Sequence, residues 1–534
     1  MTHEGRLLHF LSTPASYPHP VHRIQRRETH VSHVFLAGEY AYKLKKPVTF
    51  PFLDASTLAL RLKYCRLELS LNRRLAPDIY LTVEPIVEVD GRLQLGGRGQ
   101  VIEWLVKMRR LPEQRMLDRL VAHRAVRQAD MVRLAERLIP FFKQAARSRA
   151  INWYGQPAQV RELVLGNLRE CQPFVGTLLS EDDRQHFEAA YRQYLALQEP
   201  LLARRVREGR IIDGHGDLRC ENICMTDPVH VFDCVEFQPA FRCGDLVNDL
   251  SFLAMDLEFR GRADLSNALI RAYQQGLHDP TMPTMLSFYQ CHRSLVRGKV
   301  RGFAWQQHPR TAQGRQVRAL ARRHFQLARR YARQFAPPRL VVVGGLIGTG
   351  KSTLARQLAE AFGAAWLRTD EIRLTEFAQA RRRPHQGFAD GLYAPQVSAL
   401  VYQRLIDRAE RLIAAGRSVI CDGTFSKAAG RDALQRMAHR YDAAFFFFEC
   451  VVPRRVATRR VATRAAAKSD ISEARPEHYD QLKAGFEPVR SSPKMWARVS
   501  GDCPPRQMVE TALVILRKMW SNTSHASSAR PVVL

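Results

Sequence analysis

One short run of residues combines glycines with a lysine and a hydroxyl. Residues 345–352 read Gly-Leu-Ile-Gly-Thr-Gly-Lys-Ser and fit the pattern G-x-x-x-x-G-K-[ST] in full. The run follows an apolar strand pattern at 340–343 and precedes a helical pattern at 352–362. Glycine lets backbone N–H groups close around a phosphate, and the N-terminus of the helix attracts the same anion. The sequence therefore predicts a site for nucleotide phosphates.

The side chains of this run have separate expected roles. Lys351 should reach the β- and γ-phosphates of ATP, where it binds the nucleotide and assists transfer, and the hydroxyl of Ser352 should ligate Mg²⁺. Asp422 ends a strand pattern at 418–422 and is a further candidate metal ligand, the alternative being an Asp that caps a helix. The candidate nucleotide-binding residues are Gly345, Leu346, Ile347, Gly348, Thr349, Gly350, Lys351, Ser352 and Thr353.

Two further sets of side chains suit the same site. Asp370 could take the proton of an acceptor hydroxyl, and Arg373 could hold the acceptor or a phosphate. The alternative for this pair is a helix cap with an ion pair along the helix. Arg460 and Arg464 share one face of a basic helical pattern and could close over the transferred phosphate, and a solvated basic face is the alternative.

A second group with the spacing of a phosphoryl-transfer site lies in the first half of the chain. Asp217 and Asn222 belong to the run His-Gly-Asp-Leu-Arg-Cys-Glu-Asn at 215–222, and Asp233 follows the next strand pattern. Asp217 would meet the acceptor hydroxyl, while Asn222 and Asp233 would hold Mg²⁺ beside the phosphates. His215 should orient this loop rather than act as a base. The alternative for the whole set is a polar turn between two strands.

Such a site also needs a lysine on a strand, paired with a glutamate on a helix. Lys43 lies in the strand pattern at 34–45, and Glu68 lies in the helical pattern at 58–75. Lys43 would hold the α- and β-phosphates, and Glu68 would hold Lys43. Lys45 shares the face of Lys43, so the choice between the two lysines stays open.

Several acids and arginines further along have a structural interpretation. Asp245 and Asp249 should be acids at a helix N-terminus that pair with an arginine. Arg293, Arg297 and Arg301 recur at i,i+4 spacing. We expect them to form a solvated face, with contact to an anionic acceptor as the alternative.

The region 340–516 resembles the small P-loop kinases of the predicted-kinase group, which also includes chloramphenicol phosphotransferase-like and polynucleotide-kinase-like members. The resemblance rests on the P-loop, Thr-Asp-x-x-Arg at 369–373, Cys-Asp-Gly-Thr-Phe at 421–425, and Lys-Ser-Asp-Ile-Ser-Glu at 468–473. It implies transfer of the γ-phosphoryl group to a small acceptor or a nucleotide-like hydroxyl.

The region 32–303 resembles the aminoglycoside phosphotransferase family, because the loop His-Gly-Asp-x-x-x-x-Asn and the later Asp are intact. The full layout, with Tyr-Lys-Leu-Lys-Lys-Pro-Val at 42–48 and Asn-Arg-Arg-Leu-Ala-Pro at 72–77, is similar to a bacterial group in which this domain is fused to a P-loop kinase. One departure is the absence of Gly-x-Gly-x-x-Gly before Lys43.

These resemblances and the length of 534 residues imply two domains. We expect an N-terminal α+β bilobal domain of protein-kinase-like fold at 1–335, a linker at 336–339, a C-terminal α/β P-loop NTPase sandwich with a parallel sheet at 340–520, and a flexible tail at 521–534.

The composition is that of a globular protein with a strongly basic charge. Hydrophobic residues make up 46%, and the net charge is +30. The charge is spread along the chain, so we interpret it as a general bias of the composition toward arginine together with two polyphosphate sites. Nucleic-acid binding is the alternative. No stretch has the ~18 uncharged apolar residues of a membrane span, and the ten cysteines are scattered. We therefore expect a cytoplasmic protein.

Three functions are compatible with these features. The first is a bifunctional kinase with two sites for ATP and Mg²⁺ and a small hydroxyl-bearing acceptor at each. The second is a polynucleotide-type kinase that uses the basic charge to hold phosphates. The third is a regulatory module in which one domain binds ATP and controls the other.

Overall fold

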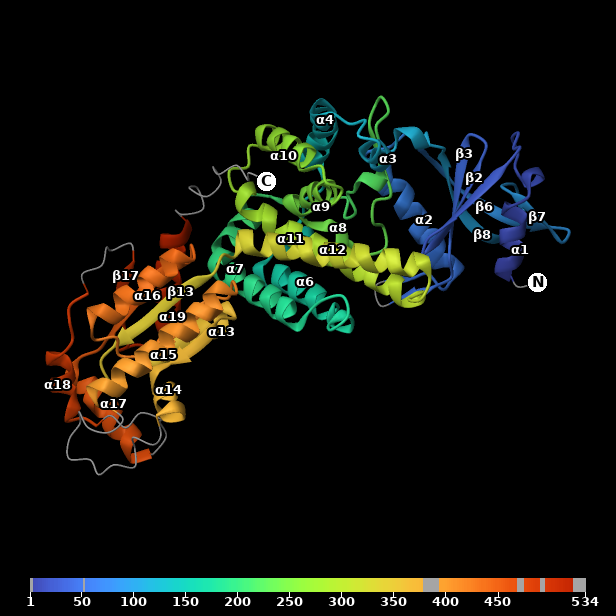
Figure 1. Ribbon diagram of the computed structural model, residues 1–534. Helices are drawn as coiled ribbons and strands as arrows, with labels where there is room; N and C mark the ends of the chain where they lie inside the picture. The colour runs from blue at the N-terminus through green and yellow to red at the C-terminus, as the bar shows by residue number, and fades with distance from the viewer. Residues whose placement is uncertain (1–2, 51–52, 378–392, 468–474, 490–494, 522–534) are drawn as a thin grey trace. The chain divides into compact units, whose positions relative to one another are not determined.

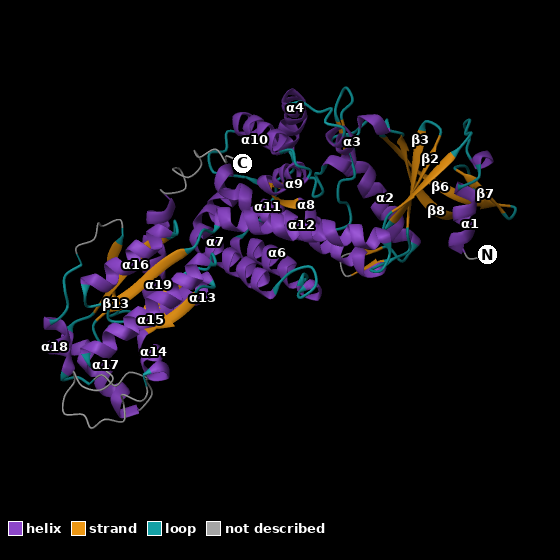
Figure 2. Ribbon diagram, viewed as in Figure 1, coloured by secondary structure: helices purple, strands orange, loops and turns teal. Residues whose placement is uncertain are grey.

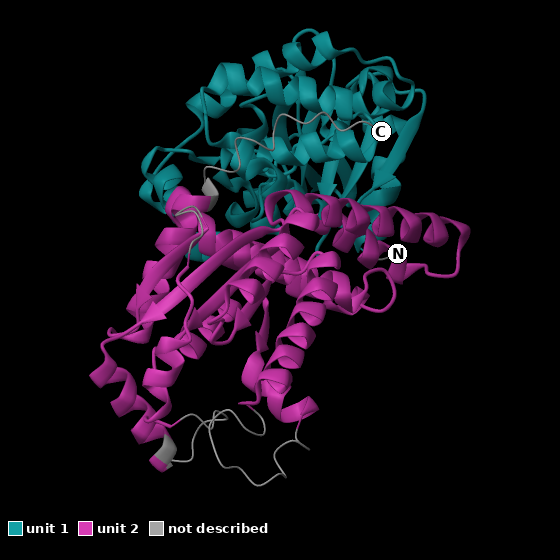
Figure 3. Ribbon diagram, turned by 60° about the vertical axis from the view of Figure 1, so that its left-hand side comes forward, with its two compact units in different colours: residues 1–160, 203–294 teal, residues 161–202, 295–534 magenta. Residues whose placement is uncertain are grey.

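The computed structural model describes residues 3–50, 53–377, 393–467, 475–489 and 495–521 (Figure 1). Contacts divide the chain into two compact units. The first consists of residues 1–160 and 203–294, and the second of residues 161–202 and 295–534 (Figure 3). The helices at 161–202 and 295–335 thus group with the P-loop region, whereas the sequence places them in the N-terminal domain. The functional boundary near residue 335 stays a prediction.

The first unit begins with a six-stranded antiparallel sheet. Its strand order is β1 (Ile24–Glu28), β2 (Ser32–Ala37), β3 (Tyr40–Lys45), β8 (Gln100–Arg109), β6 (Tyr80–Val89) and β7 (Arg92–Leu95). The turn between β2 and β3 contains Gly38 at a φ of +60°, a conformation that glycine adopts readily in a tight hairpin. A short ribbon of β4 (Thr49–Phe50) and β5 (Leu53–Asp54) follows.

Alternation along β3 decides which side chains face each helix. Tyr42 and Leu44 are buried with α1 (His3–Leu11) on one face of the sheet. Ala41 is buried on the other face with Cys65 of α2 (Leu58–Asn72). Successive side chains of a strand point to opposite faces, so Lys43 and Lys45 point to the α2 face.

Helices dominate the chain after the sheet. They are α3 (Leu117–Ala122), α4 (Gln128–Gln144), α5 (Arg149–Trp153), α6 (Pro157–Arg169), α7 (Glu181–Arg207), α8 (Pro239–Arg242), α9 (Leu246–Phe259), α10 (Ala263–Leu277), α11 (Met282–Gln307) and α12 (Ala312–Phe335). Short strands β9 (Ile211–Asp213), β10 (Ile223–Cys224), β11 (His230–Val231) and β12 (Cys243–Asp245) frame the loop that starts at His215. The sheet followed by helices confirms the α+β class.

One predicted helix end is wrong. We expect a helix over 129–139 that stops before Pro140, but α4 continues through this proline to Gln144. Phe142 in the last turn is fully buried, and Phe141 is nearly so. Burial of this apolar face outweighs the hydrogen bond that a proline removes from a helix.

The second unit contains a parallel five-stranded sheet, as expected. The strand order is β14 (Ala365–Arg368), β15 (Val419–Asp422), β13 (Arg339–Gly345), β16 (Ala444–Val451) and β17 (Trp496–Ser500). Helices cover both faces (Figure 2). They are α13 (Lys351–Phe362), α14 (Thr369–Glu376), α15 (Pro395–Ala414), α16 (Ala428–Arg440), α17 (Arg454–Ala467), α18 (His478–Ala484) and α19 (Pro505–Ser521).

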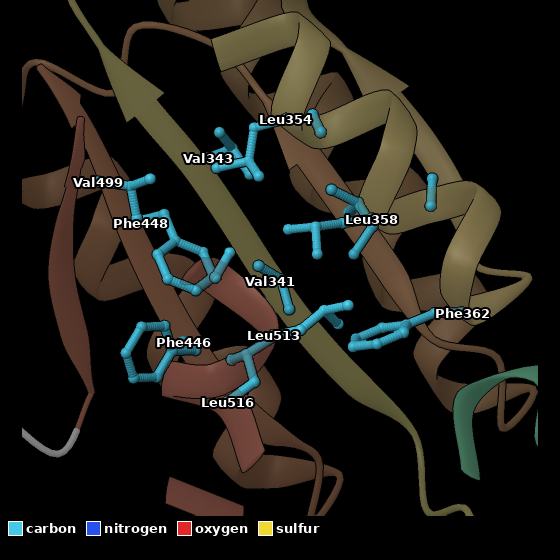
Figure 4. Close-up of a cluster of buried hydrophobic side chains, with 14 of the residues drawn as sticks. Val341, Val343, Leu354, Leu358, Phe362, Phe446, Phe448, Val499, Leu513 and Leu516 are labelled. Atoms are coloured by element: carbon cyan, nitrogen blue, oxygen red, sulfur yellow. The ribbon is translucent and has the colours of Figure 1, made fainter. Parts of the chain in front are cut away.

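Two apolar clusters hold this sheet between its helices. On one face, Val341 and Val343 pack with Leu358 of α13 and Leu516 of α19 (Figure 4). On the other face, Leu340 and Val342 pack with side chains of α15 and α16. The apolar run 340–343 of β13 is therefore buried on both sides, which is typical of a central parallel strand. No helix among the described residues is both long and apolar enough to cross a membrane.

Candidate functional sites

Lys43 of the first unit bridges two carboxylates from distant parts of the chain. Its Nζ donates to Glu68 Oε1 at 2.7 Å and to Asp233 Oδ1 at 2.7 Å. Glu68 lies on α2 and is fully buried, whereas the Asp233 side chain is 45% exposed. The structure thus brings together three residues that the sequence predicts to share a site.

Lys45 makes a parallel but deeper set of contacts. Its Nζ donates to Glu68 Oε2 at 2.7 Å and to Glu236 Oε1 at 2.5 Å. Both partners of Lys45 are buried, while Lys43 contacts the half-exposed Asp233. The geometry therefore favours Lys43 as the nucleotide-facing lysine and gives Lys45 a supporting role.

The shared carboxylate responds to both lysines. Burial alone would raise the pKa of Glu68, but the charges of Lys43 and Lys45 and their hydrogen bonds lower the pKa to about 2. Burial opposes the charge of Lys43, yet the carboxylates of Asp233 and Glu68 hold its pKa well above the usual value. Glu68 and Lys43 therefore stay charged at neutral pH.

The loop after β9 places Asp217 next to Asn222. The Asn222 amide donates to Asp217 Oδ2 at 2.9 Å and to the Asp217 carbonyl at 2.9 Å. The His215 ring contacts the Phe232 carbonyl through Nε2 at 3.1 Å, and its Nδ1 accepts from the Asp217 N–H at 3.3 Å. The Phe232 N–H in turn donates to the Asn222 carbonyl at 3.0 Å. These bonds join the Asp217 loop to the segment that carries Asp233.

His215 therefore orients the loop, as expected. Burial, as the main cause, lowers the pKa of His215, so the ring is neutral at neutral pH. Asp249 adds a second restraint, because its carboxylate accepts the N–H groups of His215 at 2.5 Å and Gly216 at 2.8 Å. Gly216 has a φ of +84°, and a Cβ there would lie 2.8 Å from the Phe241 carbonyl, so only glycine fits. Asp249 is a structural acid in the first turn of α9 with an arginine partner, as expected, because Arg293 Nη2 lies 3.7 Å from its Oδ1. Its bonds to the loop N–H groups are an additional role.

Two arginines beside this loop were missed or misread from the sequence. Arg219 binds Asp217 through two hydrogen bonds, from Nε to Oδ1 at 2.7 Å and from Nη2 to Oδ2 at 2.8 Å. Arg293 is not on a solvated face as expected: it is 6% exposed and donates to the Gly216 carbonyl at 3.1 Å. Charge spacing on a helix cannot distinguish these positions, because loop contacts over 77 residues decide the burial of Arg293.

In the second unit, the run 345–352 forms the predicted loop between β13 and α13. Gly345, Gly348 and Gly350 have φ values of +138°, +77° and +91°. A Cβ on Gly348 would lie 2.5 Å from the Ala457 carbonyl of α17, and one on Gly345 would lie 2.5 Å from the Cys450 carbonyl. The backbone thus needs glycine at these positions, and α13 begins at Lys351. The loop and helix N-terminus have the form expected for phosphate binding.

Asp422 lies at the end of β15, beside Ser352 and Lys351. It is 3% exposed, and its Oδ1 has no hydrogen-bond partner among the described residues. Burial raises the pKa of Asp422, while the charge of Lys351 and a hydrogen bond from Ser352 partly oppose this effect. A hydroxyl and a buried carboxylate oxygen without a partner are hard oxygen donors that suit Mg²⁺. The residues present therefore fit the implied metal.

The acceptor-side candidates lie near this carboxylate. Asp370 lies at the start of α14, and its negative charge contributes to raising the pKa of Asp422 and of Tyr402. Arg373 is buried, donates to Ser398 Oγ at 3.2 Å and lies 4.6 Å from the ring centre of Tyr393. Ser398 and Tyr393 therefore hold the Arg373 side chain in place. An ion pair with Asp370 along the helix does not by itself explain this position.

Arg368 was not predicted from the sequence. Its Nε lies 3.6 Å from Asp422 Oδ2, and its guanidinium lies 4.7 Å from the ring centre of Trp366. The contact depends on β14 and β15 pairing in register, Arg368 opposite Asp422. It adds a cation to the carboxyl end of the sheet.

The basic helix α17 packs directly on the P-loop. Ala457 and Val461 are buried in one cluster with Ile347. Arg460 and Arg464 follow Ala457 by three and seven residues, so they lie on the same face of the helix. Both are half-buried, whereas Arg454 pairs with Asp480 at 3.0 Å in solvent. This placement is compatible with arginines that close over a phosphate, and the motif at 468–473 lies outside the described residues.

A separate cavity of about 210 Å³ lies at the amino ends of the strands of the same sheet, whereas the P-loop follows the carboxyl end of β13. Its lining includes His186 and Gln193 of α7 and Gly363 and Ser418 of the segments before β14 and β15. Because these positions precede the strands, the cavity is distant from the P-loop, which follows β13. Its lining contains none of the predicted site residues.

A known family and two solved structures are similar to parts of this chain. Residues 340–489 match the family described as AAA domain. A sugar kinase from a Janibacter species is 23% identical, with 34% of this chain and 95% of that chain covered and a TM-score of 0.27. A choline/ethanolamine kinase family protein from Mesorhizobium loti is 16% identical, with 61% and 98% covered and a TM-score of 0.35. At these TM-scores the two structures carry no argument about activity. The AAA match and the loop geometry support a nucleotide-dependent phosphotransferase.

Curated relatives cover most of the chain. The uncharacterized proteins Rv2004c of Mycobacterium tuberculosis and Mb2027c of Mycobacterium bovis are each 35% identical over 452 residues. The similarity spans 84% of this chain and 87% of each relative, and so includes residues of both units. The chain therefore belongs to the same family as these mycobacterial proteins.

Proposed function

We propose that the chain is a bifunctional ATP-dependent phosphotransferase, in which each site transfers the γ-phosphoryl group of ATP to a hydroxyl of a small molecule. The observation that carries this proposal is the convergence of Lys43, Glu68 and Asp233, from three distant segments, in a unit distinct from the P-loop unit. Chance polar turns do not bring a strand lysine, a helix glutamate and a loop aspartate into contact at 2.7 Å.

The first site has the side chains for positioning and proton transfer. Lys43 would bind the α- and β-phosphates while Glu68 fixes its direction, and Asn222 and Asp233 are the candidate Mg²⁺ ligands. Asp217 would hold the acceptor hydroxyl and receive its proton as the oxygen attacks the γ-phosphorus. The bond from this phosphorus to the bridging oxygen breaks, and ADP leaves with the electron pair. Bound Mg²⁺ would neutralise charge on the phosphate oxygens.

The second site supplies a preformed cradle. Backbone N–H groups of 345–353 and the N-terminus of α13 would bind the phosphates, with Lys351 at the β- and γ-phosphates. Ser352 and Asp422 would hold Mg²⁺, Asp370 would accept the proton of the acceptor hydroxyl, and Arg460 and Arg464 would stabilise the transferred phosphoryl group. The proposal thus assigns a complete set of side chains to each site.

Transfer of label from γ-labelled ATP into a metabolite extract tests this function. We expect the Asp217→Asn variant to lose one set of labelled products and the Lys351→Ala variant to lose another. If added oligonucleotides are labelled and small molecules are not, the polynucleotide-kinase function replaces the proposal. If ATP binds but no label is transferred under any condition, the regulatory function replaces it.

A further inference from the structure

We propose that Arg219 binds an oxyanion of the acceptor, a phosphate or carboxylate group, and that this group releases Asp217 for transfer. The inference rests on the proposed function of the Asp217 site and names the chemical class of its acceptor. It follows from how Arg219 and Asn222 contact the carboxylate of Asp217.

Both oxygens of Asp217 are engaged. Arg219 contacts Oδ1 at 2.7 Å and Oδ2 at 2.8 Å, and Asn222 contacts Oδ2 at 2.9 Å. A carboxylate in a two-point bond with a guanidinium is a weak proton acceptor, because its charge is committed to the arginine. Release of Oδ1 by Arg219 would free the oxygen that Asn222 does not contact and would make Asp217 a stronger acceptor for the proton of an acceptor hydroxyl.

Arg219 cannot release Asp217 by moving into solvent without a substitute partner. Its side chain is 10% exposed and lies 5.9 Å from the ring centre of Phe252. Glu221 binds its Nη1, but Glu221 is shared with Arg260 at 3.1 Å. Asp256 adds a nearby negative charge, but it also pairs with Arg260. Without Asp217, Arg219 would therefore share both remaining carboxylates with Arg260, and an oxyanion of the acceptor would restore the lost negative charge.

The position of Arg219 favours the acceptor over ATP as this source. The partners of Lys43 are Glu68 on α2 and Asp233, so the nucleotide phosphates belong on the sheet side of the site. Arg219 instead contacts Phe252 of α9 and the residue Glu221, which binds Arg260 at the end of α9. A cationic acceptor would offer Arg219 no oxyanion and would meet it with like charge.

The step leaves the chemistry balanced. Arg219 exchanges one oxyanion for another and neither gains nor loses a proton. Asp217, once free, accepts the proton of the acceptor hydroxyl while the γ-phosphoryl group passes to the oxygen. Arg219 is thus a binding residue that decides which acceptors are used, and it takes no part in bond breaking.

Fractionation of the acceptors tests the inference on the unaltered residue. The Lys351→Ala full chain, in which the P-loop site is silenced, is incubated with γ-labelled ATP and with an extract divided by anion exchange into retained and unretained metabolites. We expect Asp217-dependent label in the retained, anionic fraction. Label only in the unretained fraction overturns the inference and leaves the proposed function intact. No Asp217-dependent label in either fraction overturns both.

Variants of Arg219 locate the contact. In the same background, Arg219→Gln should raise the acceptor KM at least about tenfold, as loss of a charged hydrogen bond requires, with the KM for ATP unchanged. Arg219→Lys should show a smaller rise, because it keeps the charge but not the two-point contact. Arg260→Gln, which removes the other cation on Glu221, is the matched control. A rise in the KM for ATP instead would assign Arg219 to the γ-phosphate and overturn the inference.

Discussion

The two sites of this chain are built in opposite ways. In the first unit, side chains from β3, α2 and two loops meet through ion pairs such as Lys43–Glu68. In the second unit, one contiguous loop at 345–352 presents its backbone, and its shape depends on glycine. The first site therefore depends on charge and on long-range folding, whereas the second depends on local backbone geometry. Different substitutions should consequently damage each site.

The largest expected effect is on turnover at the first site. Lys43→Met should lower Asp217-dependent transfer by about 10²–10³-fold, the range seen when a preorganised charge at a reacting phosphate is removed. P-loop transfer should not change. Label transfer measured separately for each product checks this, and equal loss of both sets of products would show that the sites are not separate.

Lys45 should affect stability more than chemistry. Lys45→Met leaves Glu236 and one oxygen of Glu68 without their buried partner, which should cost about 3–5 kcal/mol of folding free energy. Denaturant unfolding of the full chain checks this. If Lys45→Met instead keeps its stability and loses Asp217-dependent transfer, Lys45 and not Lys43 is the nucleotide-facing lysine.

The P-loop should be sensitive to the addition of one methyl group. Gly348→Ala combines a left-handed φ of +77° with a contact of 2.5 Å to the Ala457 carbonyl. The left-handed backbone alone costs about 1–2 kcal/mol. Loss of that much binding free energy should lower ATP affinity at this site by about 5- to 30-fold. Gly430→Ala is the matched control, because a Cβ there meets nothing within 4 Å. Calorimetric titration with ATP checks both variants, and unchanged affinity in Gly348→Ala contradicts the predicted loop role.

The smallest expected effect is a difference in the pH at which each site loses phosphoryl transfer. The pKa of Asp422 is raised by burial, so this carboxylate takes up a proton at a higher pH than an ordinary aspartate. The pKa of Glu68 is lowered to about 2, so its bonds to both lysines persist until much lower pH. As pH falls, P-loop transfer should therefore decline first. A pH profile of each set of products checks the order, and Asp422→Asn should remove the early decline together with most activity.

The same contrast explains what the sequence predicts well. A contiguous motif such as 345–352 fixes its own geometry, and the strand and helix beside it appear where their patterns indicate. Lys43 and Glu68 could be paired because the spacing of a strand and the next helix is itself a pattern. The choice between Lys43 and Lys45 could not be predicted from the sequence. It depends on which lysine contacts Asp233 and which contacts Glu236 in the folded chain.

The missed contacts share one cause. Arg219 on Asp217, Arg293 beneath Gly216, and Arg368 beside Asp422 join residues through loop folding or strand register. In a chain with 82 lysines and arginines, residue type alone does not separate a buried arginine from a solvated one. Contact with the ring of Phe252 or Trp366 does separate them, and this contact is visible only in the folded chain.

Independence of the two sites is the central claim, and product mapping with single and double variants tests it most directly. The account predicts that the products lost in Asp217→Asn are retained in Lys351→Ala, that the reverse also holds, and that the double variant labels nothing. Loss of the same products in both single variants would contradict the account, because one unit would then serve the other instead of carrying its own phosphoryl transfer.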